Sequence, residues 1–97
     1  MFNQLLFENT LIFFDGKVVL RNFIENGKKM TMGFMSIGDY RWLAEDSERF
    51  LIIGGCATFT FNDEIRTVKD GDEIFVPAGT TFTMSVTEAL DYRCYYA

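Results

Sequence analysis

Short runs of apolar and β-branched residues alternate with turn residues along the whole chain. Glycine, aspartate or asparagine bounds most of these runs, a pattern typical of short strands joined by tight turns. Aromatic side chains recur at every second position in pairs such as Tyr40/Trp42 and Phe59/Phe61, as expected where one face of a sheet is buried. The pattern predicts about nine strands, over residues 17–24, 29–37, 40–43, 49–53, 56–61, 65–68, 73–76, 81–86 and 90–96.

Turn residues indicate how these strands connect. Asn26-Gly27 separates two runs and predicts a hairpin, because both residue types tolerate positive φ. Gly54-Gly55 predicts another tight turn or a bulge, and residues 44–48 are polar enough to form a loop. The first eight residues, an N-terminal extension, carry the only helical tendency, and it is weak. We therefore predict an all-β jelly roll of two antiparallel sheets, although a small barrel of another topology produces a similar pattern.

Length and composition restrict the class of protein. Ninety-seven residues, 48% of them hydrophobic, are enough for one globular domain over residues 1–97. The net charge of −5 disfavours nucleic acid as a partner, because phosphate contacts need clustered cations. Cys56 and Cys94 lie in apolar runs and are expected to be free thiols, which suits a reducing cytoplasm. We see no signal peptide, and the longest apolar run, residues 11–14, is far shorter than the roughly 20 residues of a membrane span.

The stretch from Gly71 to Val86, GDEIFVPAGTTFTMSV, resembles the second sequence motif of the cupins. Gly71, Pro77 and Gly79 occupy the turn positions of that motif. Phe82 stands where the motif has a metal-binding histidine, and Val86 replaces its asparagine. The resemblance implies a cupin jelly roll.

The metal ligands of the cupin motifs are missing from this chain. Glu48 and Gly55 keep the spacing of a glutamate and a glycine in the first motif, whereas its two histidine positions fall near Trp42 and Ala44. The sequence contains no histidine at all. A single carboxylate surrounded by apolar residues cannot supply the three or four ligands that a transition metal needs. We therefore predict neither a metal site nor a cofactor.

Residues 9–97 resemble one family of small bacterial cupins, the pyrimidine/purine nucleoside phosphorylases, formerly a domain of unknown function. Five elements carry the resemblance, in the order and spacing of the family. They are FFDGKV at 13–18, GDYRW at 38–42, the element from Glu48 to Gly55, FVPAGTTF at 75–82 and DYRCYY at 91–96.

The resemblance implies an activity: nucleoside and phosphate give free base and ribose 1-phosphate, across purines and pyrimidines. It also implies a homodimer, no metal and a cytoplasmic location. The chain departs from the family pattern at Gly54, where serine is common, and at Ser47, where proline often precedes the glutamate. Tyr95 stands where some relatives have a basic residue, and Arg93 lies two positions earlier on the same predicted strand face.

Phosphorolysis needs an anion near the sugar and a cation for phosphate. Glu48 is the candidate anion, because the motif spacing points it into the jelly roll, although most glutamates are exposed to water. Arg93 is the candidate for phosphate, with Lys17 and Arg66 as reserves, because the planar fork of arginine matches phosphate oxygens. A solvated surface charge is the alternative for each of these cations.

A nucleobase needs a flat apolar surface, which aromatic rings provide. Tyr40, Trp42 and Phe82 share the predicted inward face, and Tyr95 lies near the end of the chain. These four residues are the predicted substrate-binding group, with plain core packing as the alternative, above all for Phe82. The rival function is a non-enzymatic, metal-free cupin that binds a sugar, a nucleoside or another small metabolite, because one fold hosts many functions.

Overall fold

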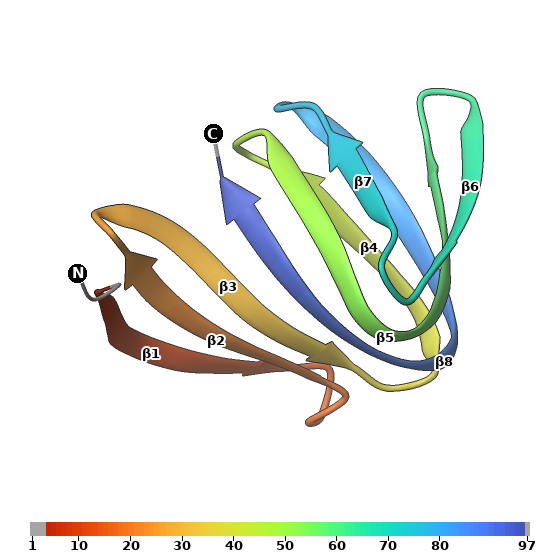
Figure 1. Ribbon diagram of the computed structural model, residues 1–97. Coiled ribbons are helices and arrows are strands. Elements are labelled where there is room, and N and C mark those ends of the chain that lie inside the picture. The colour runs from red at the N-terminus through yellow and green to blue at the C-terminus, as the bar shows by residue number, and fades with distance from the viewer. Residues whose placement is uncertain (1–3, 97) are drawn as a thin grey trace.

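The computed structural model describes residues 4–96, which form one antiparallel sheet of eight strands folded over into two layers (Figure 1). Within these residues no helix is long and apolar enough to cross a membrane. The strands are β1 (Leu5–Phe13), β2 (Val18–Glu25), β3 (Lys28–Met35), β4 (Gly38–Ala44), β5 (Glu48–Phe61), β6 (Glu64–Lys69), β7 (Glu73–Val76) and β8 (Thr80–Tyr96).

The two longest strands, β5 and β8, belong to both layers. The first part of β8 pairs with β4 and with the last part of β5, while its last part pairs with β3 and with the first part of β5. Strand β7 extends the first part of β5, and β6 extends its last part. Figure 1 shows both long strands curving where the layers meet. One layer is therefore β1-β2-β3-β8-β5-β7, and the other is β4-β8-β5-β6.

Glycine permits the bend at which β5 passes from one layer to the other. The register between β5 and β8 shifts on both sides of Gly54, from Ile52 to Cys56. Gly55 has a φ of 97°, and a Cβ atom placed there would lie 2.9 Å from the carbonyl oxygen of Glu88 and closer still to that of Ala89. Only glycine adopts this backbone conformation at low cost while another backbone lies so near.

The core lies between the two layers. Phe50 comes from the first part of β5, Phe59 from its last part and Phe82 from β8. The ring centroids of Phe50 and Phe59 are 5.2 Å apart, and those of Phe59 and Phe82 are 6.0 Å apart in a stacked arrangement. These rings join the two layers and exclude water from the fold.

Strand β1 contributes little to this core. It forms one edge of the sheet, and every one of its residues is exposed. Six of them are large and apolar: Leu5, Leu6, Phe7, Leu11, Ile12 and Phe13.

The structure confirms the all-β jelly roll and the hairpin at Asn26-Gly27, where both residues have positive φ. The predicted weak helix is wrong for residues 4–8, because β1 begins at Leu5 and pairs with β2; residues 1–3 lie outside the described residues. The separate strands predicted at 49–53 and 56–61 are one strand, β5, and those at 81–86 and 90–96 are one strand, β8. A bulge bends a strand while its hydrogen bonding to the neighbouring strand continues. Residues such as Gly54-Gly55 therefore marked a bend in β5 and not its end.

Replacing Gly55 by alanine tests the constraint at the bend. We expect Gly55→Ala to lower the free energy of unfolding by about 2–4 kcal/mol, because it adds left-handed strain and a backbone clash. The matched control is Gly54→Ala, where an added Cβ meets no atom within 4 Å and the change should cost less than about 1 kcal/mol. Urea unfolding of both variants measures the difference, and equal stabilities would contradict this account of the bend.

Candidate functional site

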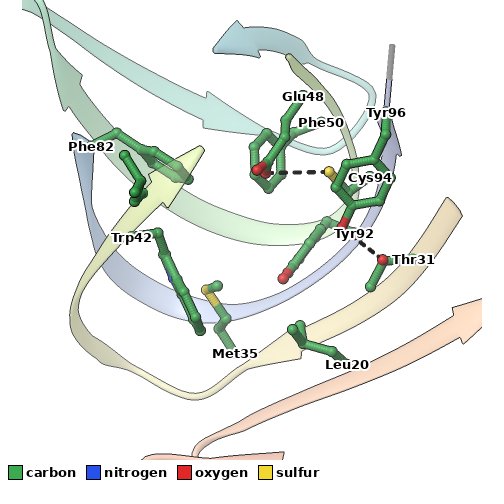
Figure 2. Close-up of a pocket in the computed structure, with 11 residues that line it drawn as sticks. Leu20, Thr31, Met35, Trp42, Glu48, Phe50, Phe82, Tyr92, Cys94 and Tyr96 are labelled. Atoms are coloured by element: carbon green, nitrogen blue, oxygen red, sulfur yellow. Dashed lines mark hydrogen bonds between the residues drawn. The ribbon is translucent and has the colours of Figure 1, made fainter. Parts of the chain in front are cut away.

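A pocket opens between the two layers, with an empty volume of about 440 Å³ including its mouth (Figure 2). Side chains from β2, β3, β4, β5 and β8 line it, so strands far apart in sequence meet there. Most of the lining is apolar or aromatic, with a few polar groups, as is usual for small-molecule sites. The lining residues are Leu20, Thr31, Met35, Trp42, Leu43, Glu48, Phe50, Phe82, Tyr92, Cys94 and Tyr96.

Strand register brings the polar and aromatic groups of the pocket together. Trp42 on β4 and Phe82 on β8 are register partners, so their side chains leave the sheet on the same face. Glu48 on β5 is the register partner of Tyr96 on β8. Since side chains alternate along a strand, Tyr92, Cys94 and Tyr96 all point toward the interior from β8.

Glu48 is the only carboxylate among the residues that line the pocket. Its Oε1 accepts a hydrogen bond from the Cys94 thiol, with 3.5 Å between oxygen and Sγ (Figure 2). Burial raises the pKa of Glu48 above its ordinary value of 4.5; the thiol hydrogen bond lowers it somewhat, and the charge of Asp46 raises it further. Burial also raises the pKa of Cys94, so the thiol stays protonated and donates rather than acting as a nucleophile.

A chain of hydrogen bonds leads from the pocket to the edge of the sheet. Thr31 donates its hydroxyl hydrogen to Oδ1 of Asn22, with 2.7 Å between the two oxygens. Because Thr31 has no second hydroxyl hydrogen, its Oγ1 accepts the hydrogen bond from the Tyr96 hydroxyl, at 2.8 Å. Asn22 in turn donates through Nδ2 to Oδ1 of Asn9 on β1, at 2.8 Å. Figure 2 shows the contact between Tyr96 and Thr31 at the pocket. The chain holds the Tyr96 ring in place at the pocket mouth and ties β1 to β8.

A wider basin adjoins the pocket and shares Tyr96 with it. Lys29 on β3 borders the basin and holds its Nζ 5.4 Å from the centroid of the Tyr96 ring. Arg49 borders the basin too, but its Nη1 lies 2.8 Å from Oε1 of Glu73 and its guanidinium stacks on Tyr95. Within residues 4–96, Lys29 has no carboxylate within ion-pair distance, so its charge is available at the mouth of the pocket.

The structure brings three of the six predicted site residues into the pocket: Glu48, Trp42 and Phe82. Phe82 also stacks on Phe59, so the core packing foreseen as its alternative holds as well. The indole N–H of Trp42 is enclosed without a hydrogen-bond partner among the described residues. An enclosed donor without a partner is rare in folded proteins.

The other predicted site residues lie elsewhere. Tyr40 is buried, donates its hydroxyl to the Ser36 carbonyl at 2.8 Å and packs on Phe14, outside the pocket. Arg93 and Tyr95 alternate with the inward residues of β8, so they leave the sheet on its outer face, where Tyr95 borders the wider basin.

The reserve cations are also remote from the pocket. Lys17 borders a separate hollow beside Phe14 and Asp39, and Arg66 is exposed on β6. Neither residue contributes to the pocket lining.

Sequence reasoning missed five polar contributors to the site: Lys29, Thr31, Tyr92, Cys94 and Tyr96. The alternation of Tyr92, Cys94 and Tyr96 in the ending DYRCYY indicates one shared strand face, and that signal was available. Lys29 begins the strand predicted over residues 29–37 and is the second residue of β3, but no sequence pattern marks it as part of the site.

No group of three or more histidine, cysteine, aspartate or glutamate side chains suited to a metal ion occurs in the part of the chain that the structure describes. Glu48 and Cys94 form a pair without a third ligand of these types nearby. The donor set therefore does not fit a cupin metal centre.

Known proteins resemble this chain in fold. A protein of unknown function from Vibrio parahaemolyticus superposes with a TM-score of 0.87 at 24% identity, covering 92% of this chain and 97% of that one. A protein with domain of unknown function 1255 from Acinetobacter sp. ADP1 also has a TM-score of 0.87, at 22% identity, with 98% and 94% covered. An ethanolamine utilization protein Q from Salmonella typhimurium has a TM-score of 0.70 at 18% identity, with 99% and 97% covered. These likenesses support the small cupin fold.

Sequence relatives are more informative about the family. A pyrimidine/purine nucleoside phosphorylase from Clostridioides difficile is 33% identical over 88 residues, which are 88% of this chain and 84% of that one. Another from Geotalea daltonii is 36% identical over 86 residues, covering 86% and 83%. Residues 8–96 match the family described as pyrimidine/purine nucleoside phosphorylase. With nearly its whole length matched, this chain belongs to the pyrimidine/purine nucleoside phosphorylase family.

Proposed function

We propose that this protein is a nucleoside phosphorylase of broad specificity, converting a purine or pyrimidine nucleoside and phosphate into free base and ribose 1-phosphate. One observation carries the proposal: Glu48 is a half-buried carboxylate in a pocket lined by the rings of Trp42 and Phe82. Membership of the family supports the reaction class. The proposal includes no metal, because the pocket lacks a set of metal ligands among the described residues.

The pocket suits the two ends of a nucleoside. The base lies against the apolar and aromatic lining, where Trp42 provides a flat surface. The sugar lies beside Glu48, whose charge stabilises the oxocarbenium-like centre as the C1′–N bond breaks and a phosphate oxygen bonds to C1′. A carboxylate in this partly water-excluded position exerts a stronger field than one in water.

Lys29 is the proposed cation for phosphate. Its ammonium group lies over the Tyr96 ring at the mouth of the pocket and has no acidic partner among residues 4–96. Phosphate bound there lies beside the pocket opening and reaches the sugar from the basin. Arg93, the candidate from sequence, points to the other face of the sheet, so the proposed site uses Lys29 in its place.

The lining also supports broad specificity. None of the residues that line the pocket is an asparagine, a glutamine or an aspartate, the side chains that distinguish one base edge from another by paired hydrogen bonds. Apolar contact and stacking discriminate weakly between flat rings. Both purines and pyrimidines are therefore expected substrates.

The proposal includes a homodimer formed through β1. This edge strand carries six exposed large apolar side chains, and its outer edge is unpaired within residues 4–96. An exposed apolar edge strand is a pairing site, and two copies of one strand meet in a self-complementary way about a two-fold axis. A cytoplasmic location is the remaining part of the proposal, supported by the free thiols of Cys56 and Cys94.

Incubation with uridine and with adenosine, each with and without inorganic phosphate, tests the reaction. We expect free base to appear only when phosphate is present, and chromatography measures it. Base released equally without phosphate would indicate a hydrolase and remove the role of Lys29. No base from any common nucleoside would favour the non-enzymatic cupin, which a nucleoside would stabilise against heat without being consumed.

Within the same assay, Lys29→Ala should raise the KM for phosphate about tenfold or more while leaving the KM for the nucleoside little changed. Lys17→Ala is the matched control, because it removes a lysine far from the pocket and should change neither value. Arg93→Ala should also leave the phosphate KM unaltered. A raised phosphate KM in Arg93→Ala alone would return the assignment to the sequence-based candidate.

Glu48→Gln should lower kcat/KM about a hundredfold, since it removes the charge opposite the developing cation. The same change should raise stability at neutral pH. The pKa of the Glu48 carboxyl is near 4.5 in the unfolded chain and higher in the folded protein. Between these two pKa values the folded state therefore binds more protons than the unfolded state. The free energy of unfolding of the wild type therefore falls as pH rises through that window, and Glu48→Gln avoids the loss.

Urea unfolding of the wild type and of Glu48→Gln, at a pH below 4.5 and at pH 7, measures how much more stable the variant is. We expect this difference in stability to be larger at pH 7. Glu45→Gln is the control, an exposed carboxylate in the loop before β5, and it should change neither activity nor this pH dependence. Unchanged kcat/KM in Glu48→Gln would exclude Glu48 from the reaction.

Light scattering during size-exclusion chromatography tests the dimer. The wild type should have twice the chain mass of 11.2 kDa. Ile12→Glu on β1, where the isoleucine is 64% exposed, should give monomers because it places a charge in the interface. Ile65→Glu on β6, 74% exposed, is the control and should stay dimeric. A monomeric wild type would overturn the proposal.

A further inference from the structure

Tyr92 is a buried residue whose hydroxyl has no protein hydrogen-bond partner among the described residues. The residue is 3% exposed and lines the pocket, and none of the side-chain hydrogen bonds among residues 4–96 involves its hydroxyl. The hydroxyl is not among the fully enclosed polar atoms that lack a partner, so its oxygen is open to the pocket. Figure 2 shows the hydroxyl oxygen pointing into the pocket, on the side where Trp42 and Met35 lie. With no protein partner among residues 4–96 and an opening to the pocket, this hydroxyl is free to bind a ligand.

The other tyrosines that point inward are already satisfied. Tyr40 donates to the Ser36 carbonyl, and Tyr96 forms its hydrogen bond with Thr31. Tyr92 is therefore the inward tyrosine whose donor remains available within the described residues. Burial raises the pKa of Tyr92 well above its ordinary value of 10.0, so the phenol keeps its proton at neutral pH.

Packing holds the Tyr92 ring in one position. The ring lies across Gly33 on β3, its register partner, where a Cβ atom would lie 2.7 Å from Cε1 of the tyrosine. The Phe50 ring packs on it with centroids 5.4 Å apart. A donor on a ring fixed in this way needs little reorganisation to act, which is the condition for electrostatic catalysis.

We propose that the Tyr92 hydroxyl donates a hydrogen bond to the departing base, and this inference rests on the proposed phosphorolysis. As the C1′–N bond breaks, its electron pair moves onto the base, and a phosphate oxygen forms the new bond to C1′. The hydrogen bond stabilises the charge on the base while the proton stays on the phenol. The proton that the base finally gains is balanced by the one that hydrogen phosphate loses on becoming ribose 1-phosphate.

A single donor serves both classes of base. A purine carries the acceptor N3 beside its glycosidic carbon–nitrogen linkage, and a pyrimidine carries the acceptor O2 in the corresponding position. A hydroxyl rotates about its C–O bond and so adapts to either acceptor. Tyr92 would thus stabilise the leaving group without selecting between purines and pyrimidines.

The variant Tyr92→Phe tests this role, because it keeps the ring between Gly33 and Phe50 and removes only the hydroxyl. We expect kcat for uridine phosphorolysis to fall about 10- to 100-fold. The fall should be at least about threefold smaller with 5-fluorouridine, whose fluorine withdraws charge from the departing ring and reduces the need for a donor. Tyr40→Phe is the control, a buried hydroxyl outside the pocket, and should affect both substrates equally. Equal losses on both substrates in Tyr92→Phe, or no loss, would overturn the assignment.

A binding measurement separates this inference from the reaction itself. If the wild type releases no base from any nucleoside, the proposed phosphorolysis fails, and calorimetry with free uracil then tests Tyr92. A Kd weakened about fivefold or more in Tyr92→Phe, with Tyr40→Phe unchanged, would retain Tyr92 as the donor to the base. An unchanged Kd in Tyr92→Phe would reject it.

Discussion

The bend of β5 against β8 is the constraint on which the rest of the structure depends. At this point Gly55 approaches the backbone of Ala89 so closely that no side chain fits, and its positive φ turns the strand into the second layer. Because both long strands pass through the bend, each contributes residues to both layers. The pocket exists because the two halves of β5 and β8 face one another across the space that the bend creates.

The same geometry explains the chemistry of the pocket. Glu48 begins β5 and is paired with Tyr96 at the end of β8, so a carboxylate meets aromatic and hydroxyl groups from the other end of the sequence. The apolar lining raises the pKa of Glu48, and the buried thiol of Cys94 supplies its hydrogen bond. The pocket thus places one anion, several rings and a few neutral donors close together. Such a set binds and polarises a ligand through fixed dipoles and one charge.

Two features of the pocket, one at its mouth and one inside it, define the orientation proposed for the ligand. Lys29 lies at the mouth over the Tyr96 ring, whereas the Tyr92 hydroxyl lies inside against Gly33. In the proposed reaction, phosphate at the first and the base at the second place the sugar between them, next to Glu48. The proposed reaction and the proposed donor follow from this order along the pocket.

Much of the fold could be predicted from the sequence, because it depends on local chemistry. The period-two pattern marked every strand except β1, and Asn26-Gly27 marked a hairpin through its tolerance of positive φ. The stretch from Gly71 to Val86 resembled a cupin motif. The family also followed from the sequence, as did the place of Glu48 and Trp42 in the pocket. Gly54-Gly55 was recognised as a bulge or a turn, but nothing local distinguishes a strand that ends from one that bends.

The sequence by itself determined every strand except β1 and the lack of a histidine ligand, since composition and alternation are properties of the chain alone. Its motifs added the resemblance to the cupin jelly roll and to the family. Only the tertiary structure decided which cation lies at the pocket and which tyrosine lacks a partner. Arg93 and Lys29 are equally basic, but strand register turns one to the outer face and the other toward the pocket mouth. Register arises from pairing between distant strands, so a residue's neighbours across the sheet determine its surroundings.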